Sequence, residues 1–280
     1  MQCAPDTDIG RNGVFLKWVL LPYKRQRPEP PAEKGFPLPG ERLGRVLFTE
    51  PASMGNRALK ITIRQLLGDD DFETVLDTLQ QIPGRQAVNP LFSFFYSGEE
   101  QLSWRAVTAM GAVVANLAED SMESARVVMR RLIWNLNDES GGIGWGSPQA
   151  MGEITAVHAG LAAEFANVLI SYIDPQGNFL EHERLQRGSL WGVGRLAHAR
   201  PLLAQPAAAF LPAFYRSPDP YLRGTAIWAT GPILDDAVRP LLESRLSDSA
   251  RLRLYRQMRI TEPTVAELAR EALTVSNLDT

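Results

Sequence analysis

The chain has 280 residues, of which 45% are hydrophobic and 22% charged, and its formal net charge is −3 at pH 7. This composition is typical of a folded protein with a continuous core, and it excludes disorder along the whole chain. The small negative charge disfavours sequence-independent nucleic-acid binding, which needs a cationic surface. Cys3 is the single cysteine, so an intramolecular disulfide is excluded and a reducing, cytoplasmic setting is expected.

The N-terminal part of the chain differs in pattern from the remainder. Prolines punctuate residues 1–55 and helical periodicity is absent, so we expect an irregular or disordered leader there. The apolar run at residues 14–21 is interrupted by Lys17 and is too short to span a membrane. It is a candidate strand or docking segment. Met54, which directly precedes the first helical pattern, is an alternative start of the biological chain. We therefore expect a leader over residues 1–55 and a folded domain over residues 56–275.

After the leader, amphipathic stretches of helical length alternate with short breakers. Three of these helices are expected to begin where proline follows a side-chain acceptor, at Asn89, Ser147 and Asp219. The predicted helices cover residues 57–67, 72–81, 90–96, 102–117, 122–136, 148–158, 161–173, 185–199, 207–215, 220–233, 237–245, 250–259 and 263–273.

A small residue, any residue and then glycine recur along these helices, with the glycines at Gly111, Gly152, Gly194 and Gly231. Their spacings of 41, 42 and 37 residues fall in the range of helical-hairpin repeats. A glycine inside a helix costs about 1 kcal/mol relative to alanine. We expect close packing of neighbouring helices to offset that cost, because the missing side chain lets two helix axes approach.

The best-formed copy of this pattern spans residues 219–231 and reads DPYLRGTAIWATG. It resembles the second helix of HEAT-type repeats, in the short form found in phycobilisome lyases. Residues 185–194 are a looser copy, and the first two copies carry Trp104 and Trp145 where the third has Arg187. The resemblance covers residues 102–231 and implies an all-α superhelix, a HEAT-like alpha-solenoid with an irregular N-terminal leader. It implies no single function, because this class includes scaffolds, lyases and base-excision enzymes.

Residues 134–153 form the most unusual local segment, WNLNDESGGIGWGSPQAMGE, and resemble a hallmark of uncharacterised bacterial HEAT-repeat proteins. Glycines let the backbone approach a ligand, tryptophans offer flat apolar faces, and the polar side chains offer acceptors. One interpretation is a partner-binding pocket; the other is a structural loop whose tryptophan fills the gap between repeats. The candidate binding residues in this segment are Trp134, Asn137, Asp138, Glu139, Trp145 and Glu153.

Four further candidates lie on the repeat helices: Trp104, Arg187, Trp191 and Arg223. Tryptophan and arginine often carry interface energy, so these residues are candidates for lining a concave groove. In proteins of the resembled class, such arginines usually pair with acidic residues in a ladder between repeats. Glu183 and Asp219 precede the two arginines by four residues. The ladder and the groove remain alternative interpretations.

No catalytic triad, phosphate-binding loop or dinucleotide fingerprint is present in the sequence. The three histidines, His158, His182 and His198, are not spaced like metal ligands, and we expect each to lie at a helix end or on the surface. We therefore expect no cofactor and no metal.

We predict an interaction or scaffold protein that binds a protein or peptide on a concave face, without nucleic acid or membrane as a partner. The alternative is an enzyme of the same architecture, either an alkylated-base DNA glycosylase or a lyase acting on a cofactor-bearing protein. The DNA enzyme would need a continuous positive groove containing Trp104, Trp145 and Trp191.

Overall fold

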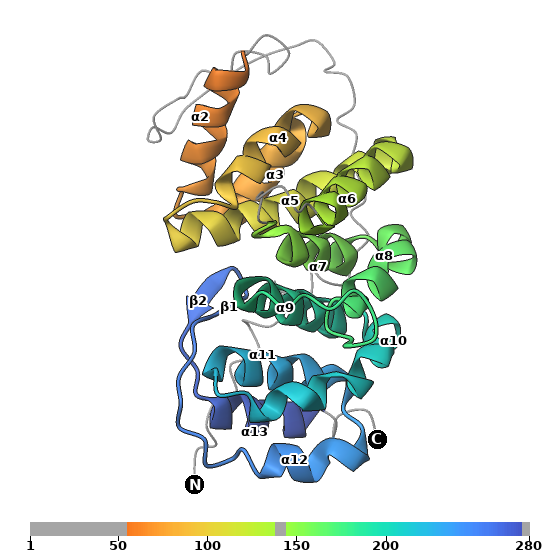
Figure 1. Cartoon of the computed structure of the whole chain (residues 1–280). Coiled ribbons are helices and arrows are strands. Elements are labelled where there is room, and N and C mark those ends of the chain that lie inside the picture. Colours follow the sequence, from red (N-terminus) through yellow and green to blue (C-terminus); the bar gives the residue numbers. More distant parts are fainter. Residues whose placement is uncertain (1–54, 138–143, 276–280) are drawn as a thin grey trace, which may run out of the picture.

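The computed structural model describes residues 55–137 and 144–275, and these residues are mostly helical (Figure 1). The α-helices are α2 (Asn56–Leu67), α3 (Phe72–Gln81), α4 (Gly84–Phe94), α5 (Glu100–Asp120), α6 (Met122–Asn137), α7 (Ser147–Val157), α8 (Ala159–Ser171), α9 (Glu183–Ala199), α10 (Pro201–Ala204), α11 (Pro220–Thr230), α12 (Arg239–Glu243) and α13 (Val265–Val275). The 3-10 turns are η2 (Gln205–Ala209), η3 (Leu211–Arg216), η4 (Gly231–Ile233) and η5 (Asp236–Val238). Two short strands, β1 (Leu254–Arg256) and β2 (Arg259–Thr261), lie between α12 and α13.

The helices form two rows that run along the stack (Figure 1). One row consists of α5, α7, α9, α11 and α13, each in contact with the next, and we call it the inner row. Each inner helix is preceded by a partner from the other row: α4, α6, α8, the α10–η3 segment and α12. This regular succession of antiparallel pairs confirms the predicted all-α helical-repeat solenoid.

The recurring glycines lie where adjacent inner helices touch. A Cβ at Gly152 would overlap the backbone of Gly192 on α9, and one at Gly194 would overlap the indole of Trp228 on α11. At Gly111, a Cβ would lie 2.5 Å from Cγ of Glu153 on α7. The packing explanation is therefore confirmed for these three glycines, because a side chain there would force the inner helices apart. Gly231 begins η4 and makes a less close contact, since a Cβ there would lie 3.2 Å from Cα of Ala272 on α13.

One of the three predicted helix starts has the expected cap and one is wrong. Asp219 caps α11 by accepting a hydrogen bond from the backbone N–H of Tyr221 at 2.9 Å. Helix α7 begins at Ser147, one residue before the predicted start at Pro148. Its N-cap is Gly146, with φ of 80°, and no side chain caps it, so the predicted cap by Ser147 is wrong. Pro90 lies inside α4 instead of starting it, because the helix begins directly after Pro83, which sets the break.

The predicted helix over residues 250–259 is also wrong. This segment contains strand β1, which pairs antiparallel with β2, with Tyr255 opposite Ile260. Leu252 and Leu254 are buried whereas Arg251 and Arg253 are exposed. That two-residue alternation is a strand pattern, and the helix prediction for this stretch overlooked it. The helix expected over residues 207–215 is instead made of 3-10 turns.

Candidate functional site

The C-terminal hairpin β1–β2 folds back across the inner row. The Tyr255 ring stacks on that of Trp104 of α5, with 4.9 Å between centroids and 8° between planes. Its hydroxyl lies 3.1 Å from Oγ1 of Thr108, and its backbone carbonyl accepts a 2.7 Å hydrogen bond from the indole N–H of Trp191 on α9. Two inner helices are thereby joined to the end of the array, and we call this contact the hairpin latch.

The hairpin latch covers two residues that were predicted to line a groove, Trp104 and Trp191. Trp191 is only 1% exposed, and its ring packs against those of Trp104, Trp228 and Tyr255. The prediction that Trp191 lines an accessible groove is therefore wrong, because its indole is part of the core. Trp104 is half-buried, and Tyr255 covers one face of its ring.

The two predicted arginines form ion pairs between repeats. Arg187 of α9 donates from Nε to Oδ2 of Asp219 at 2.8 Å, and it also pairs with Glu183 on its own helix. Arg223 of α11 donates to Asp248 at 2.7 Å. These contacts match the ladder interpretation, and both guanidinium groups are already engaged by carboxylates.

Glu153 lies on the inner face of α7, where Nε and Nη2 of Arg195 hold its carboxylate at 2.8 and 3.1 Å. The side chains of the pair are 7% and 11% exposed. Gly111 provides the space for Glu153, because a Cβ there would contact its side chain. Glu153 is thus a partner in a buried ion pair and does not face a partner-binding pocket. Nor do its neighbours make a metal site: in the described ranges, no group of histidine, cysteine and carboxylate residues could hold an ion.

The structure describes the segment 134–153 in two parts, residues 134–137 at the end of α6 and residues 144–153. Trp134 is 70% exposed, and Asn137 is exposed at the last position of α6. The indole of Trp145 instead packs near the ring of Tyr96. Asp138 and Glu139 lie outside the described residues. The structure therefore places Trp134 and Trp145 in different surroundings.

Trp145 belongs to an edge where the inner helices begin. Its ring lies 6.3 Å from that of Tyr96, which precedes α5, and the Arg184 guanidinium from the first turn of α9 lies 3.7 Å from its centroid. One repeat further, the Arg187 guanidinium lies 5.4 Å from the ring centroid of Tyr221 on α11. Arginine thus meets an aromatic ring across two successive repeat boundaries. We call these five residues the arginine–aromatic edge.

The edge presents an exposed cation beside exposed aromatic surface. Tyr96 is 49% exposed, and Arg184 is exposed. Partial burial against the indole lowers the pKa of Arg184, but an arginine stays protonated at neutral pH. Within the described ranges, no carboxylate forms an ion pair with Arg184, and the Trp145 indole N–H has no hydrogen-bond acceptor. The edge therefore retains unused donors.

Sequence reasoning missed several residues that matter here. Arg184 lies one turn before Arg187, but nothing local distinguishes it until α7 and α9 are placed side by side. Arg195 was missed because its partner Glu153 lies 42 residues earlier. Tyr255 had a usable signal in the alternation of arginine and leucine before it. Two predicted histidines do lie at helix starts: His158 caps α8 and His182 caps α9.

The protein is a helical-repeat solenoid in which the hairpin between α12 and α13 contacts α5 and α9. No family model matches the chain. An uncharacterised protein of Archaeoglobus fulgidus is 30% identical over 107 residues, which are 38% of this chain, so the chain spans about half (52%) of that protein's length.

Two solved structures with a similar course of the chain are designed proteins. An engineered protein matches with 16% identity and a TM-score of 0.45, covering 80% of this chain and 98% of the other. A computationally designed armadillo-repeat protein for modular peptide recognition matches with 16% identity and a TM-score of 0.42, covering 76% and 98%. In the described ranges, no helix is long and apolar enough to cross a bilayer.

Proposed function

We propose that this protein is a non-enzymatic interaction protein that binds a protein or peptide partner along the arginine–aromatic edge. The stack of Arg184 on Trp145 carries the proposal, because it presents a guanidinium without a carboxylate partner in the described part of the chain. Arginine and aromatic residues dominate the binding energy of many interfaces. A guanidinium held 3.7 Å from the centre of an indole ring is also restrained before binding, which lowers the entropy cost of using it.

The chemistry of the edge favours an acidic partner segment. Four inner helices, α5, α7, α9 and α11, begin at or near this edge, and helix N-termini attract negative charge. The edge's own carboxylates are occupied, since Glu183 pairs with Arg187 and Glu100 pairs with Arg253. A partner carboxylate would therefore meet Arg184 without displacing an internal ion pair. Tyr96 would contribute an apolar contact beside it.

We also propose that the repeats are of the HEAT-like short form. The motif in residues 219–231 supports this, because Asp219 caps α11 and accepts the bond from Arg187 of the previous repeat. Arg223 continues the pattern by bonding to Asp248 of the next repeat. The same aspartate thus serves as helix cap and as ladder partner.

The enzymatic alternative receives no support from the described residues. It required a positive groove holding Trp104, Trp145 and Trp191. Trp191 is in the core, and Trp104 is covered on one face by Tyr255. The inner-row arginines Arg187 and Arg223 are neutralised by carboxylates. These three tryptophans therefore do not line one open cationic surface.

The proposal can be tested by affinity purification from the native cell with the full chain. The informative variant is Tyr96→Ala with Arg184→Ala, because both side chains are exposed. The matched control is Arg270→Ala, which removes the same charge from an exposed position on α13. We expect a specific partner to be captured by the wild type and the control but lost from the double variant, with little change in the thermal midpoint.

A second measurement uses the purified partner. We expect Arg184→Ala to weaken binding by about tenfold, in line with a central arginine at an interface. Raising the salt concentration should weaken binding of the wild type more than binding of this variant, because salt screens the contact between guanidinium and carboxylate. Equal affinity and equal salt dependence in wild type and variant would overturn the proposed binding edge.

A further inference from the structure

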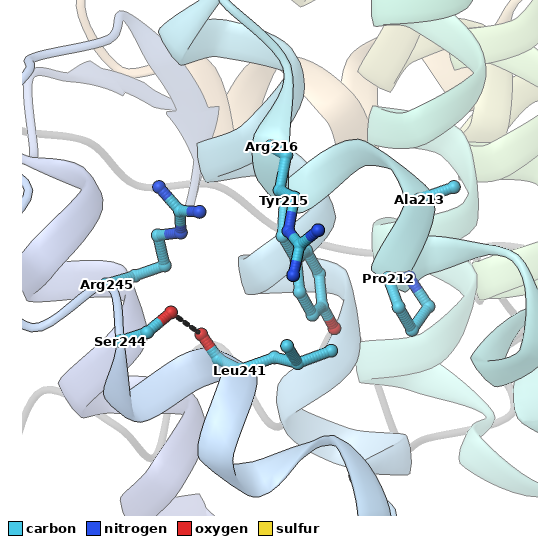
Figure 2. Close-up of a pocket in the computed structure, with 7 residues that line it drawn as sticks. All are labelled: Pro212, Ala213, Tyr215, Arg216, Leu241, Ser244 and Arg245. Carbon is cyan, nitrogen blue, oxygen red and sulfur yellow. Dashed lines mark hydrogen bonds between the residues drawn. The ribbon is translucent and has the colours of Figure 1, made fainter.

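A second candidate site lies away from the arginine–aromatic edge, between η3 and the end of α12. A pocket of about 290 Å³ opens there, and the side chains around it come from these two segments (Figure 2). Pro212, Tyr215 and Leu241 supply apolar wall, while Arg216 and Arg245 supply two guanidinium groups. The pocket thus combines two positive charges with an apolar surface.

The wall's other polar groups are already satisfied. The Tyr215 hydroxyl bonds to Oγ1 of Thr230 at 2.5 Å, and burial raises the pKa of this phenol to about 12, so it stays neutral. The Ser244 hydroxyl donates to the carbonyl of Leu241 at 2.7 Å (Figure 2). The two arginines therefore provide the pocket's unused hydrogen-bonding capacity.

The two guanidinium groups have no carboxylate partner among the residues of the described ranges. Arg216 is exposed, and Nε of Arg245 is buried without an acceptor. Arg245 contributes to lowering the pKa of Asp248, but both oxygens of that carboxylate bond to Arg223, at 2.7 and 3.2 Å. The two arginines thus bring positive charge to the pocket without an ion-pair partner in the described ranges.

We propose that this pocket binds a small organic oxyanion, namely a carboxylate or phosphate carried on an apolar group. Two guanidinium forks suit the oxygens of such an ion, because arginine donates two parallel bonds to planar or tetrahedral oxyanions. The ring of Tyr215 and the side chains of Leu241 and Pro212 would contact the apolar part. The volume admits a group of modest size.

The test is calorimetric titration of the full chain at constant ionic strength with three probes: inorganic phosphate, phenyl phosphate and benzoate. We expect phenyl phosphate or benzoate to bind, and to bind more tightly than inorganic phosphate because of the apolar wall. A preference for phenyl phosphate would identify phosphate as the head group, and a preference for benzoate would identify carboxylate. Binding of none of the probes would overturn the proposal.

Variants assign the binding to this pocket. R216Q and R245Q should each weaken binding of the preferred probe by about tenfold or more, because each removes a charged donor. R259Q, which removes an exposed arginine from the β-hairpin, is the matched control and should bind as the wild type does. If R245Q fails to fold, R216Q decides the matter, since Arg216 makes no ion pair with any described residue. Wild-type affinity in R216Q would overturn the proposal.

Discussion

Tyr255 and Trp104 stack face to face although 151 positions separate them, and this contact joins the last part of the array to its first inner helix. Repeat proteins generally hold together through contacts between neighbouring repeats. Here the hairpin latch adds a contact across several repeats. Its contribution to stability can be measured by mutation.

We expect Tyr255→Ala to lower the free energy of unfolding by about 3–5 kcal/mol, because it removes a large buried ring. Tyr255→Phe should cost about 1 kcal/mol, the net value of the hydrogen bond to Thr108. In a double-mutant cycle, Tyr255→Ala and Trp104→Ala should show a coupling of about 1 kcal/mol by chemical denaturation. Strictly additive effects would mean that the stacked rings do not interact energetically.

Gly152 offers a test of the packing between inner helices. We expect Gly152→Ala to lower the free energy of unfolding by about 3 kcal/mol, the upper end of overpacking costs, because the added Cβ would overlap the backbone of Gly192. Gly98→Ala is the control, since no atom lies within 4 Å of a Cβ there. Thermal denaturation of both variants measures the difference, and similar midpoints would contradict the close approach of α7 and α9.

The ion pair of Glu153 with Arg195 should behave as a buried pair. Glu153→Gln removes the negative charge that Nε and Nη2 of Arg195 contact in the interior, so we expect a loss of about 3–5 kcal/mol in the free energy of unfolding. Replacing both residues with methionine should recover most of that loss. The control is Glu164→Gln, which breaks the more exposed pair with Arg126 and should cost much less, because water and salt screen that pair.

His198 should make stability depend on pH. Burial lowers the pKa of His198 to about 4, partly opposed by its hydrogen bond to the Trp228 carbonyl. The unfolded chain, with a histidine pKa of about 6.5, therefore binds a proton more readily than the folded protein does. The stability that the neutral, buried His198 allows is fully present above about pH 6.5 and is lost as the pH falls towards 4. At pH 5 the loss in the free energy of unfolding amounts to about 2 kcal/mol.

The variant that isolates this effect is His198→Gln, whose amide can still donate a hydrogen bond to the carbonyl. Urea denaturation at pH 8 and pH 5 should show a smaller drop in stability for the variant than for the wild type. Parallel drops in both proteins would show that His198 does not carry this pH dependence.

The sequence predicted the array well because repeat packing is local in the chain. Gly152 and Asp219 belong to short motifs with a known physical purpose, and both have the neighbours that those motifs require. The latch was not predicted, because Tyr255 meets Trp104 only after several repeats have been stacked. For the same reason Trp191 was assigned to a groove, although the hairpin buries it.

The candidate edge was predicted in part. Trp145 was singled out by its glycine-rich surroundings, but its partner Arg184 depends on how α9 lies against α7. A periodic pattern indicates which face of a helix is buried, but it does not indicate which side chains of adjacent repeats meet.

The hairpin latch also limits the number of repeats. Inner helices lie about 8–10 Å apart, so one repeat inserted between α5 and α9 would draw Trp104 away from Tyr255 by about that distance. An open array tolerates insertion or deletion of a unit, whereas this chain would lose its closing contact in either case. The contact of the hairpin with α5 therefore restricts how many repeats can lie between α5 and α9.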